Sequence, residues 1–142
     1  MTHQIYLSLG SNIGNRKQTI HKAIALLDER VGEVTKQSSL YETAPWGFSS
    51  PNMFINACVC CLTTRSPEEV LRLTQGIERE LGRTGKSVGG QYHDRVIDID
   101  ILLYDDWVVD EPELHIPHPL MEQRDFVMQP LKEIWHERSH RA

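Results

Sequence analysis

The sequence predicts an α+β fold of the ferredoxin-like β-α-β-β-α-β order, with helices packed on one antiparallel sheet. Two segments carry apolar residues at helical spacing, and the segments around them have the alternating or continuous apolar pattern of strands. The length of 142 residues suits one domain with one core. We therefore expect a single domain over residues 1–142, with an extra hairpin and short helices after the core.

The first half of the chain predicts three strands and one helix. Residues 4–9 form the first strand, and 10–15 (GSNIGN) form a loop before a helix of about 15 residues. Residues 33–43 and 54–64 form the second and third strands, separated by a loop at 44–53 that is rich in Pro, Gly and Ser. The apolar side chains of the helix recur on one face: Ile20, Ala23, Ile24, Leu27 and Val31.

A second helix has clear start and stop signals. Ser66 can cap its N-terminus, Pro67 suits its first turn, and Glu69 completes a capping box. Gly82 is placed to end it. A polar loop rich in glycine follows, at residues 83–94.

The last part of the chain predicts one further strand, at 95–104. Asp105-Asp106 is expected to turn this strand into a short hairpin that ends near Val109. Short helices are expected around 119–124 and 127–136.

Composition narrows the class of function. The formal net charge is −5, and no block of basic residues is present, which argues against nucleic-acid or anionic-membrane binding. No stretch approaches the roughly 20 apolar residues of a membrane span, and the N-terminus lacks a signal-peptide pattern. We expect a cytoplasmic protein that is a monomer or a weak dimer.

The three cysteines, Cys58, Cys60 and Cys61, lie together in the predicted third strand. No second pair completes a zinc site, and Cys58 and Cys61 would point to opposite faces of a strand. We interpret all three as small buried hydrophobic residues.

Two aspartates interrupt an apolar strand. Asp98 and Asp100 are two residues apart, so they share one face, about 7 Å apart, while Ile97, Ile99 and Ile101 face the core. Neighbouring like charges repel, and a divalent cation between them removes the repulsion. Two Mg²⁺ ions could be held here to clamp a phosphoryl group. On this pattern alone, a solvated polar face is an equal alternative.

The loop before this strand favours the metal interpretation. It carries Arg83, Lys86 and Arg95 among glycines, and such cations can take the phosphate charge that the metal ions leave. Glycines would allow the loop to close over a substrate. GSNIGNRK does not have the spacing of a Walker A motif, so we assign Gly10 to the turn and Asn15 to the helix cap.

Further polar and aromatic residues fit nucleotide and ring binding. His115 and His118 flank a proline, which disfavours a helical metal site, and they suit hydrogen bonds to phosphate or ribose. Trp46 lies on a Pro/Gly loop that could line a site. Phe54 and Asn56 share a strand face, where an aromatic and an amide could stack on and read a flat heterocycle.

Together these pieces resemble one family, the 6-hydroxymethyl-7,8-dihydropterin pyrophosphokinases of folate biosynthesis. The resemblance extends from about residue 5 to residue 134. Its motifs, in chain order, are LGSNIGNR (9–16), YETAPWG (41–47), FINA (54–57), RVIDIDILLY (95–104) and IPHPLMEQRDF (116–126).

The resemblance implies pyrophosphoryl transfer from ATP to the hydroxymethyl group of the dihydropterin, with release of AMP. It implies that Asp98 and Asp100 hold two Mg²⁺ ions bound with ATP, and that Arg83 and Arg95 assist transfer. ATP-binding positions would be Gln75, Glu78, Lys86, Tyr92, His115, His118 and Arg124. Pterin-binding positions would be Thr43, Trp46, Phe54, Asn56 and Phe126, with the two phenylalanines on either side of the ring.

This chain has Tyr92-His93-Asp94 where many family members have Trp-Gly-Pro. Two alternatives to a pyrophosphokinase are a metal-dependent phosphohydrolase on the same carboxylates and a non-catalytic ferredoxin-like ligand-binding module. The hydrolase would need a residue that activates water, and the binding module would need neither aspartate.

Overall fold

The structure is a computed structural model that describes residues 1–45, 50–82 and 96–139, with side chains as far as residue 135. Its main sheet has the strand order β2-β4-β1-β5, and all neighbouring strands are antiparallel. The four strands are β1 (His3–Ser11), β2 (Glu33–Gln37), β4 (Phe54–Thr63) and β5 (Asp98–Tyr104). This order confirms the predicted ferredoxin-like core.

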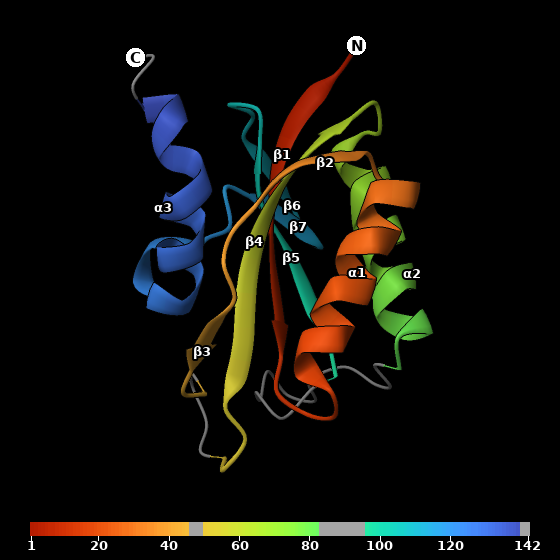
Figure 1. Ribbon diagram of the computed structural model, residues 1–142. Coiled ribbons are helices and arrows are strands. Elements are labelled where there is room, and N and C mark those ends of the chain that lie inside the picture. Colours follow the sequence, from red (N-terminus) through yellow and green to blue (C-terminus); the bar gives the residue numbers. More distant parts are fainter. Residues whose placement is uncertain (46–49, 83–95, 140–142) are drawn as a thin grey trace.

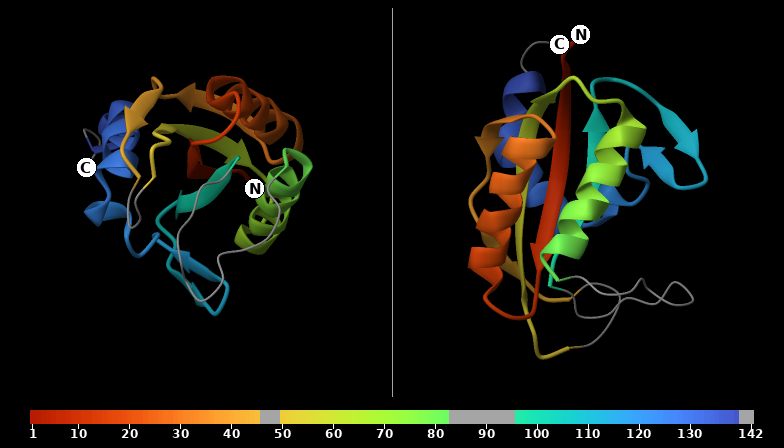
Figure 2. Two further views of the ribbon diagram at one scale, coloured as in Figure 1. Left: turned by 90° about the horizontal axis from the view of Figure 1, so that it is seen from below. Right: turned by 90° about the vertical axis from the view of Figure 1, so that its right-hand side faces the viewer.

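Helices cover both faces of the sheet (Figure 1). The two predicted helices, α1 (Arg16–Arg30) and α2 (Pro67–Glu80), lie side by side on one face, and α3 (Asp125–Ser139) lies on the other. Viewed along the strands, the sheet lies between these two layers (Figure 2). Within the described ranges, no helix has the length and apolar character required to cross a bilayer.

The predicted second strand is divided into β2 and β3 (Tyr41–Thr43), and both pieces pair with β4. The cause lies at Ser38. Its hydroxyl accepts a hydrogen bond from the backbone N–H of Cys58 at 2.9 Å, in place of a strand carbonyl. Such side-chain bonds to the backbone compete with regular strand pairing.

The expected extra hairpin after the core is present, but its predicted place at Asp105-Asp106 is wrong. β6 (Val109–Glu111) and β7 (Leu114–Ile116) pair with each other in a separate sheet, which projects beside the main one (Figure 2). Asp105 does turn the chain, with a φ of 50°, but its carboxylate accepts from the backbone N–H of Gln4 at 2.8 Å. This bond ties the turn to β1 and directs the chain away from β5.

The C-terminal region is more helical than predicted. A short 3-10 helix (Met121–Gln123) agrees with the prediction, but α3 is one helix of 15 residues with Pro130 inside it. Val127, Leu131 and Ile134 of α3 are buried against the sheet, and this burial outweighs the cost of the proline.

Glu133 fastens α3 to the segment around β3. Its carboxylate accepts from the Tyr41 hydroxyl at 2.7 Å and from the Ser39 backbone N–H at 3.0 Å. These bonds stabilise the charged form, and they hold the pKa of Glu133 below its usual range.

The apolar core has one layer on each side of the sheet. The layer under α1 and α2 contains Ile97, Ile99 and Ile101, as predicted from their alternation. Cys61 belongs to that layer, whereas Cys58 and Cys60 face α3. All three thiols are buried and free, and burial raises the pKa of Cys58 and of Cys61 to about 12. The interpretation as structural residues is confirmed.

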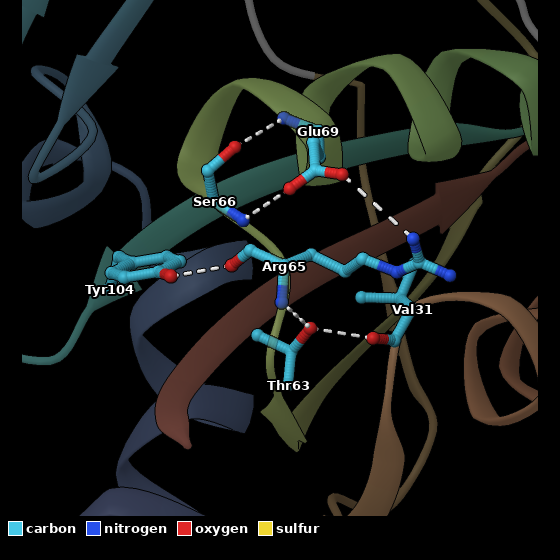
Figure 3. A network of polar contacts seen from close by, with 6 residues as sticks. All are labelled: Val31, Thr63, Arg65, Ser66, Glu69 and Tyr104. Atoms are coloured by element: carbon cyan, nitrogen blue, oxygen red, sulfur yellow. Dashed lines mark hydrogen bonds and ion pairs between the residues drawn. The ribbon is translucent and has the colours of Figure 1, made fainter. Parts of the chain in front are cut away.

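The connection from β4 to α2 is a network of polar contacts (Figure 3). Ser66 and Glu69 form the predicted capping box, with bonds of 3.2 and 3.0 Å. The Thr63 hydroxyl donates to the Val31 carbonyl at 2.6 Å, and the Tyr104 hydroxyl donates to the Arg65 carbonyl. These contacts join β5, β4 and the end of α1 at the edge of the molecule that contains the N-terminus (Figure 1).

Gly32 is a strict packing requirement, and replacing it should destabilise the fold strongly. A Cβ at Gly32 would lie 2.1 Å from the backbone oxygen of Leu62, and backbone cannot move aside as a side chain can. We expect Gly32→Ala to lower the free energy of unfolding by about 2 kcal/mol or more in urea denaturation.

The matched control is Gly76→Ala in α2, where the nearest atom to the new Cβ would be Arg79 Nη2 at 3.9 Å. Removing a glycine from a helix interior there should stabilise the protein by about 0.5–1 kcal/mol. A Gly32→Ala variant as stable as the Gly76→Ala control would refute the packing argument.

Candidate active site

Several candidate residues, Asp98, Asp100 and Asn56 among them, lie on the α3 face of the sheet, at the end where β1 stops and β4 and β5 begin. This end is opposite the two termini (Figure 1). Gln75 and Glu78 come from α2, which covers the other face. Strand register places Asp98 and Asn56 on either side of Gly10 in one row across three strands. Directly opposite residues in an antiparallel sheet share a face. Three segments far apart in the sequence therefore form one row of side chains.

Gly10 allows the side chains of Asn56 and Phe54 to approach the middle of this row closely. A Cβ at Gly10 would lie 3.0 Å from Asn56 Oδ1 and 3.5 Å from Phe54 Cδ1. The sequence interpretation placed Gly10 in a turn, and this is wrong, because Gly10 lies inside β1. The predicted cap at Asn15 is correct, since its side chain accepts from the Gln18 backbone N–H at 3.2 Å.

Asp98 and Asp100 are both half-buried on β5, opposite Gly10 and Ser8. They face away from the isoleucine layer, as their spacing predicted. Among the described residues, no group of three or more His, Cys, Asp or Glu could enclose a metal ion. The assignment of Asp98 and Asp100 to metal binding therefore stays a prediction.

Glu78 of α2 forms a hydrogen bond to β5, the strand that carries Asp98 and Asp100. Its buried carboxylate accepts from the backbone N–H of Ile99, between the two aspartates, at 2.7 Å. Gln75 is half-buried one helical turn earlier on α2. The resemblance implied a nucleotide-binding role for Glu78. The structure shows in addition that Glu78 holds β5 in place through this hydrogen bond.

His118, Arg124 and Asp98 lie close enough to influence one another electrostatically. Burial and the Arg124 guanidinium lower the pKa of His118, and the Asp98 carboxylate acts in the opposite direction. His118 Nδ1 accepts from the Leu120 backbone N–H at 3.3 Å. A neutral imidazole that accepts at Nδ1 carries its proton on Nε2, so Nε2–H is a donor.

The second histidine of the motif is placed differently. His115 is an exposed residue of β7 and forms an ion pair with Asp110 of β6 at 3.0 Å. It also contributes to lowering the pKa of His118, so the two histidines remain neighbours. His115 therefore lies at the rim of the cluster that contains His118.

The predicted ring-binding residues lie on the same face. Asn56 is buried, and its Nδ2 donates to the Thr43 hydroxyl at 2.6 Å, which orients the amide. Phe54 is half-buried next to Gly10, opposite Thr43 in the strand register. Phe126, in the first turn of α3, is half-buried beneath the Arg124 guanidinium, 5.6 Å from its ring centroid.

Five predicted site residues lie outside the described residues: Trp46, Arg83, Lys86, Tyr92 and Arg95. Their assignments stay predictions.

Sequence reasoning missed the polar contacts around the β1–α1 connection. Arg16 Nη1 donates to Glu42 Oε2 at 3.0 Å and to the Met53 carbonyl at 2.8 Å. Asn12, almost fully buried, donates to the Asn52 carbonyl at 3.3 Å. In the sequence, Asn12 and Arg16 stand out only as members of the GSNIGNR motif. The motif does not indicate which distant residues they bind.

Comparisons with known proteins point to one family. The model of the family described as 7,8-dihydro-6-hydroxymethylpterin-pyrophosphokinase (HPPK) matches residues 6–136. A 2-amino-4-hydroxy-6-hydroxymethyldihydropteridine pyrophosphokinase of Porphyromonas gingivalis is 53% identical over 131 residues, covering 92% of this chain and 89% of its own. The protein of the same name from Bacillus subtilis is 44% identical over 135 residues, covering 94% and 79%.

A solved structure supports the fold. The wild-type HPPK-DHPS protein of Plasmodium falciparum superposes with a TM-score of 0.73 at 16% identity. The match covers 93% of this chain but only 40% of that longer one. The family match and the identity to the two bacterial relatives show that this chain belongs to the 7,8-dihydro-6-hydroxymethylpterin-pyrophosphokinase family.

Proposed function

We propose that this protein transfers a pyrophosphoryl group from ATP to the hydroxymethyl group of 6-hydroxymethyl-7,8-dihydropterin and releases AMP. One observation carries the proposal beyond family membership. The row Asp98–Gly10–Asn56 sets a carboxylate suited to metal binding and an amide suited to reading a ring on either side of a floor formed by Gly10, which has no side chain. A flat heterocycle on this floor would have its reactive arm close to the carboxylates.

The donor set fits Mg²⁺ bound together with ATP. Mg²⁺ prefers one or two carboxylates plus water and substrate phosphates, rather than a cage made only of protein groups. Asp98 and Asp100 provide two carboxylates on one face. When bound, two such ions would neutralise phosphate charge during transfer.

The protein's own groups would bind and orient the substrates. The guanidinium of Arg124 and the Nε2–H of His118 are donors for ATP oxygens, and Glu78 keeps the aspartate strand in place. Thr43 holds the amide of Asn56 toward the edge of the pterin. Catalysis in this arrangement is mainly positioning for in-line displacement.

The proposal includes a cytoplasmic location and a monomeric or weakly dimeric state. ATP as donor and the net charge of −5 are consistent with this setting. Size-exclusion chromatography with light scattering tests the oligomeric state.

The decisive experiment is incubation with ATP, Mg²⁺ and hydroxymethyldihydropterin, with chromatographic assay of AMP and the dihydropterin diphosphate. We expect both products in equal amounts, and none when chelator removes Mg²⁺. Release of inorganic phosphate without pterin transfer would instead indicate a phosphohydrolase. Binding of both ligands without turnover would indicate a non-catalytic module.

A further inference from the structure

Arg16, the first residue of α1, bonds to β3 and to the residue that precedes β4, the two strands that carry ring-binding residues. We propose that Arg16 is a positioning residue that sets the affinity for the pterin substrate without touching it, an inference that rests on the function proposed above. No motif-based expectation assigned Arg16 a role, and its place in the structure is what suggests one.

A single guanidinium nitrogen of Arg16 forms both hydrogen bonds. Arg16 Nη1 donates to Glu42 Oε2 at 3.0 Å and to the Met53 carbonyl at 2.8 Å. Glu42 directly precedes Thr43, and Met53 directly precedes Phe54. Thr43 and Phe54 are opposite partners in the β3–β4 register. Arg16 therefore holds together the ends of the strands beside the two residues assigned to the pterin.

Strand pairing already holds Thr43 opposite Phe54, and Arg16 adds a contact one residue beyond the end of that pairing, at Met53. A cavity of about 380 Å³ separates the β1–α1 connection from the segment before β4, and its lining includes Gly14, Arg16, Glu42 and Pro51. Polar bonds join this segment to α1 and to the β1–α1 connection beside the cavity, among them the bond from Asn12 in that connection to the Asn52 carbonyl at 3.3 Å. Loss of the guanidinium should allow residues 50–53 to move, and the ring of Phe54 with them.

The contact should matter for position more than for global stability. The side chain of Arg16 is 30% exposed and that of Glu42 is 53% exposed, and ion pairs at such sites contribute little to the free energy of unfolding. A one-ångström displacement of a binding group, in contrast, changes substrate affinity directly. The inference thus predicts an effect on one kinetic constant and almost none on the melting temperature.

The chain offers a matched control on the same helix. Arg30, in the last turn of α1, pairs with Glu80 of α2, with Nη1 2.7 Å from Oε2. This pair has similar exposure, with side chains 36% and 51% exposed, and it lies at the opposite end of α1 from the site. Arg30→Ala therefore removes an equivalent ion pair without disturbing β3 or the segment before β4.

The test compares steady-state constants and melting temperatures of four proteins: wild type, Arg16→Ala, Arg16→Lys and Arg30→Ala. For Arg16→Ala we expect the KM for the dihydropterin to rise about three- to tenfold, as for loss of a charge-assisted hydrogen bond, with the KM for ATP and kcat nearly unchanged. Arg16→Lys should recover part of the loss, because one ammonium can still reach one of the two acceptors. Arg30→Ala should leave both KM values unchanged.

The possible outcomes separate this inference from the function on which it rests. If the wild-type protein produces AMP but Arg16→Ala raises the pterin KM no more than Arg30→Ala does, the positioning role is wrong and the function stands. The role is also wrong if the KM values for ATP and pterin rise together. Absence of AMP formation by the wild type would overturn both.

Discussion

Replacing Asp98 or Asp100 with asparagine should reduce the rate of AMP formation by at least about a hundredfold, a typical loss when a charge-stabilising group is removed from an active site. Both carboxylates are half-buried on the α3 face, and the alternating Ile99 and Ile101 anchor β5 in the core on the other face. Asparagine keeps the shape of the side chain but removes the negative charge that would bind Mg²⁺. The loss should appear at every Mg²⁺ concentration in the assay.

The same variants should fold as stably as the wild type when Mg²⁺ is absent. Each substitution removes one of two like charges on neighbouring positions of a strand face, and such charges repel. The melting temperature without Mg²⁺ should therefore stay constant or rise. The stabilisation that Mg²⁺ with an ATP analogue confers on the wild type should be lost.

Asp106→Asn is the matched control for the aspartate variants. Asp106 is exposed and follows the turn at the far end of β5. Its replacement should alter neither turnover nor the response to Mg²⁺. Near-normal activity of Asp98→Asn and Asp100→Asn at modest Mg²⁺ would exclude the metal assignment.

The second large effect is expected at Asn56, where alanine should weaken pterin binding by roughly tenfold or more. The buried amide would pair with the polar edge of the ring, and loss of one partner from such a contact costs about 1–3 kcal/mol. Nucleotide affinity should stay close to that of the wild type, because Asn56 belongs to β4 and the nucleotide groups come from elsewhere. Titration calorimetry with the pterin, in the presence of a non-hydrolysable ATP analogue, measures the change.

The Thr43→Val variant tests whether pterin affinity depends on the orientation of the Asn56 amide and not only on its presence. The Thr43 hydroxyl accepts from Asn56 Nδ2 at 2.6 Å, so valine leaves the amide in place but free to rotate. We expect a smaller loss of pterin affinity than for Asn56→Ala. Circular dichroism melting of both variants checks that the fold is retained, and unchanged affinity in a folded Asn56→Ala would make Asn56 a structural strand residue only.

Local patterns in the sequence predicted most of the fold. Helical spacing identified α1 and α2, and the capping residues Ser66 and Glu69 located the start of α2. Strict alternation around Ile99 placed Asp98 and Asp100 on one face, because side chains of a strand point to opposite faces in turn. These features depend on interactions between residues close in sequence, which a single sequence displays.

Features that depend on distant contacts were predicted poorly. The break between β2 and β3 follows from the bond between Ser38 and Cys58, and the turn after β5 from the bond between Asp105 and Gln4. Burial of α3 against the sheet extended the second of the two expected short helices to 15 residues. In each case, a partner far along the chain outweighed the local preference.

By itself, the sequence determined the ferredoxin-like order of elements, the paired aspartates and the motifs that mark the family. Only the tertiary structure decided which groups meet. The register of β5, β1 and β4 aligns Asp98, Gly10 and Asn56 in one row, and it shows that Gly10 belongs to β1 rather than to a turn. The physical reason is that register is set by the side chains of whole strands packing into a shared core, and no short stretch of sequence contains that information.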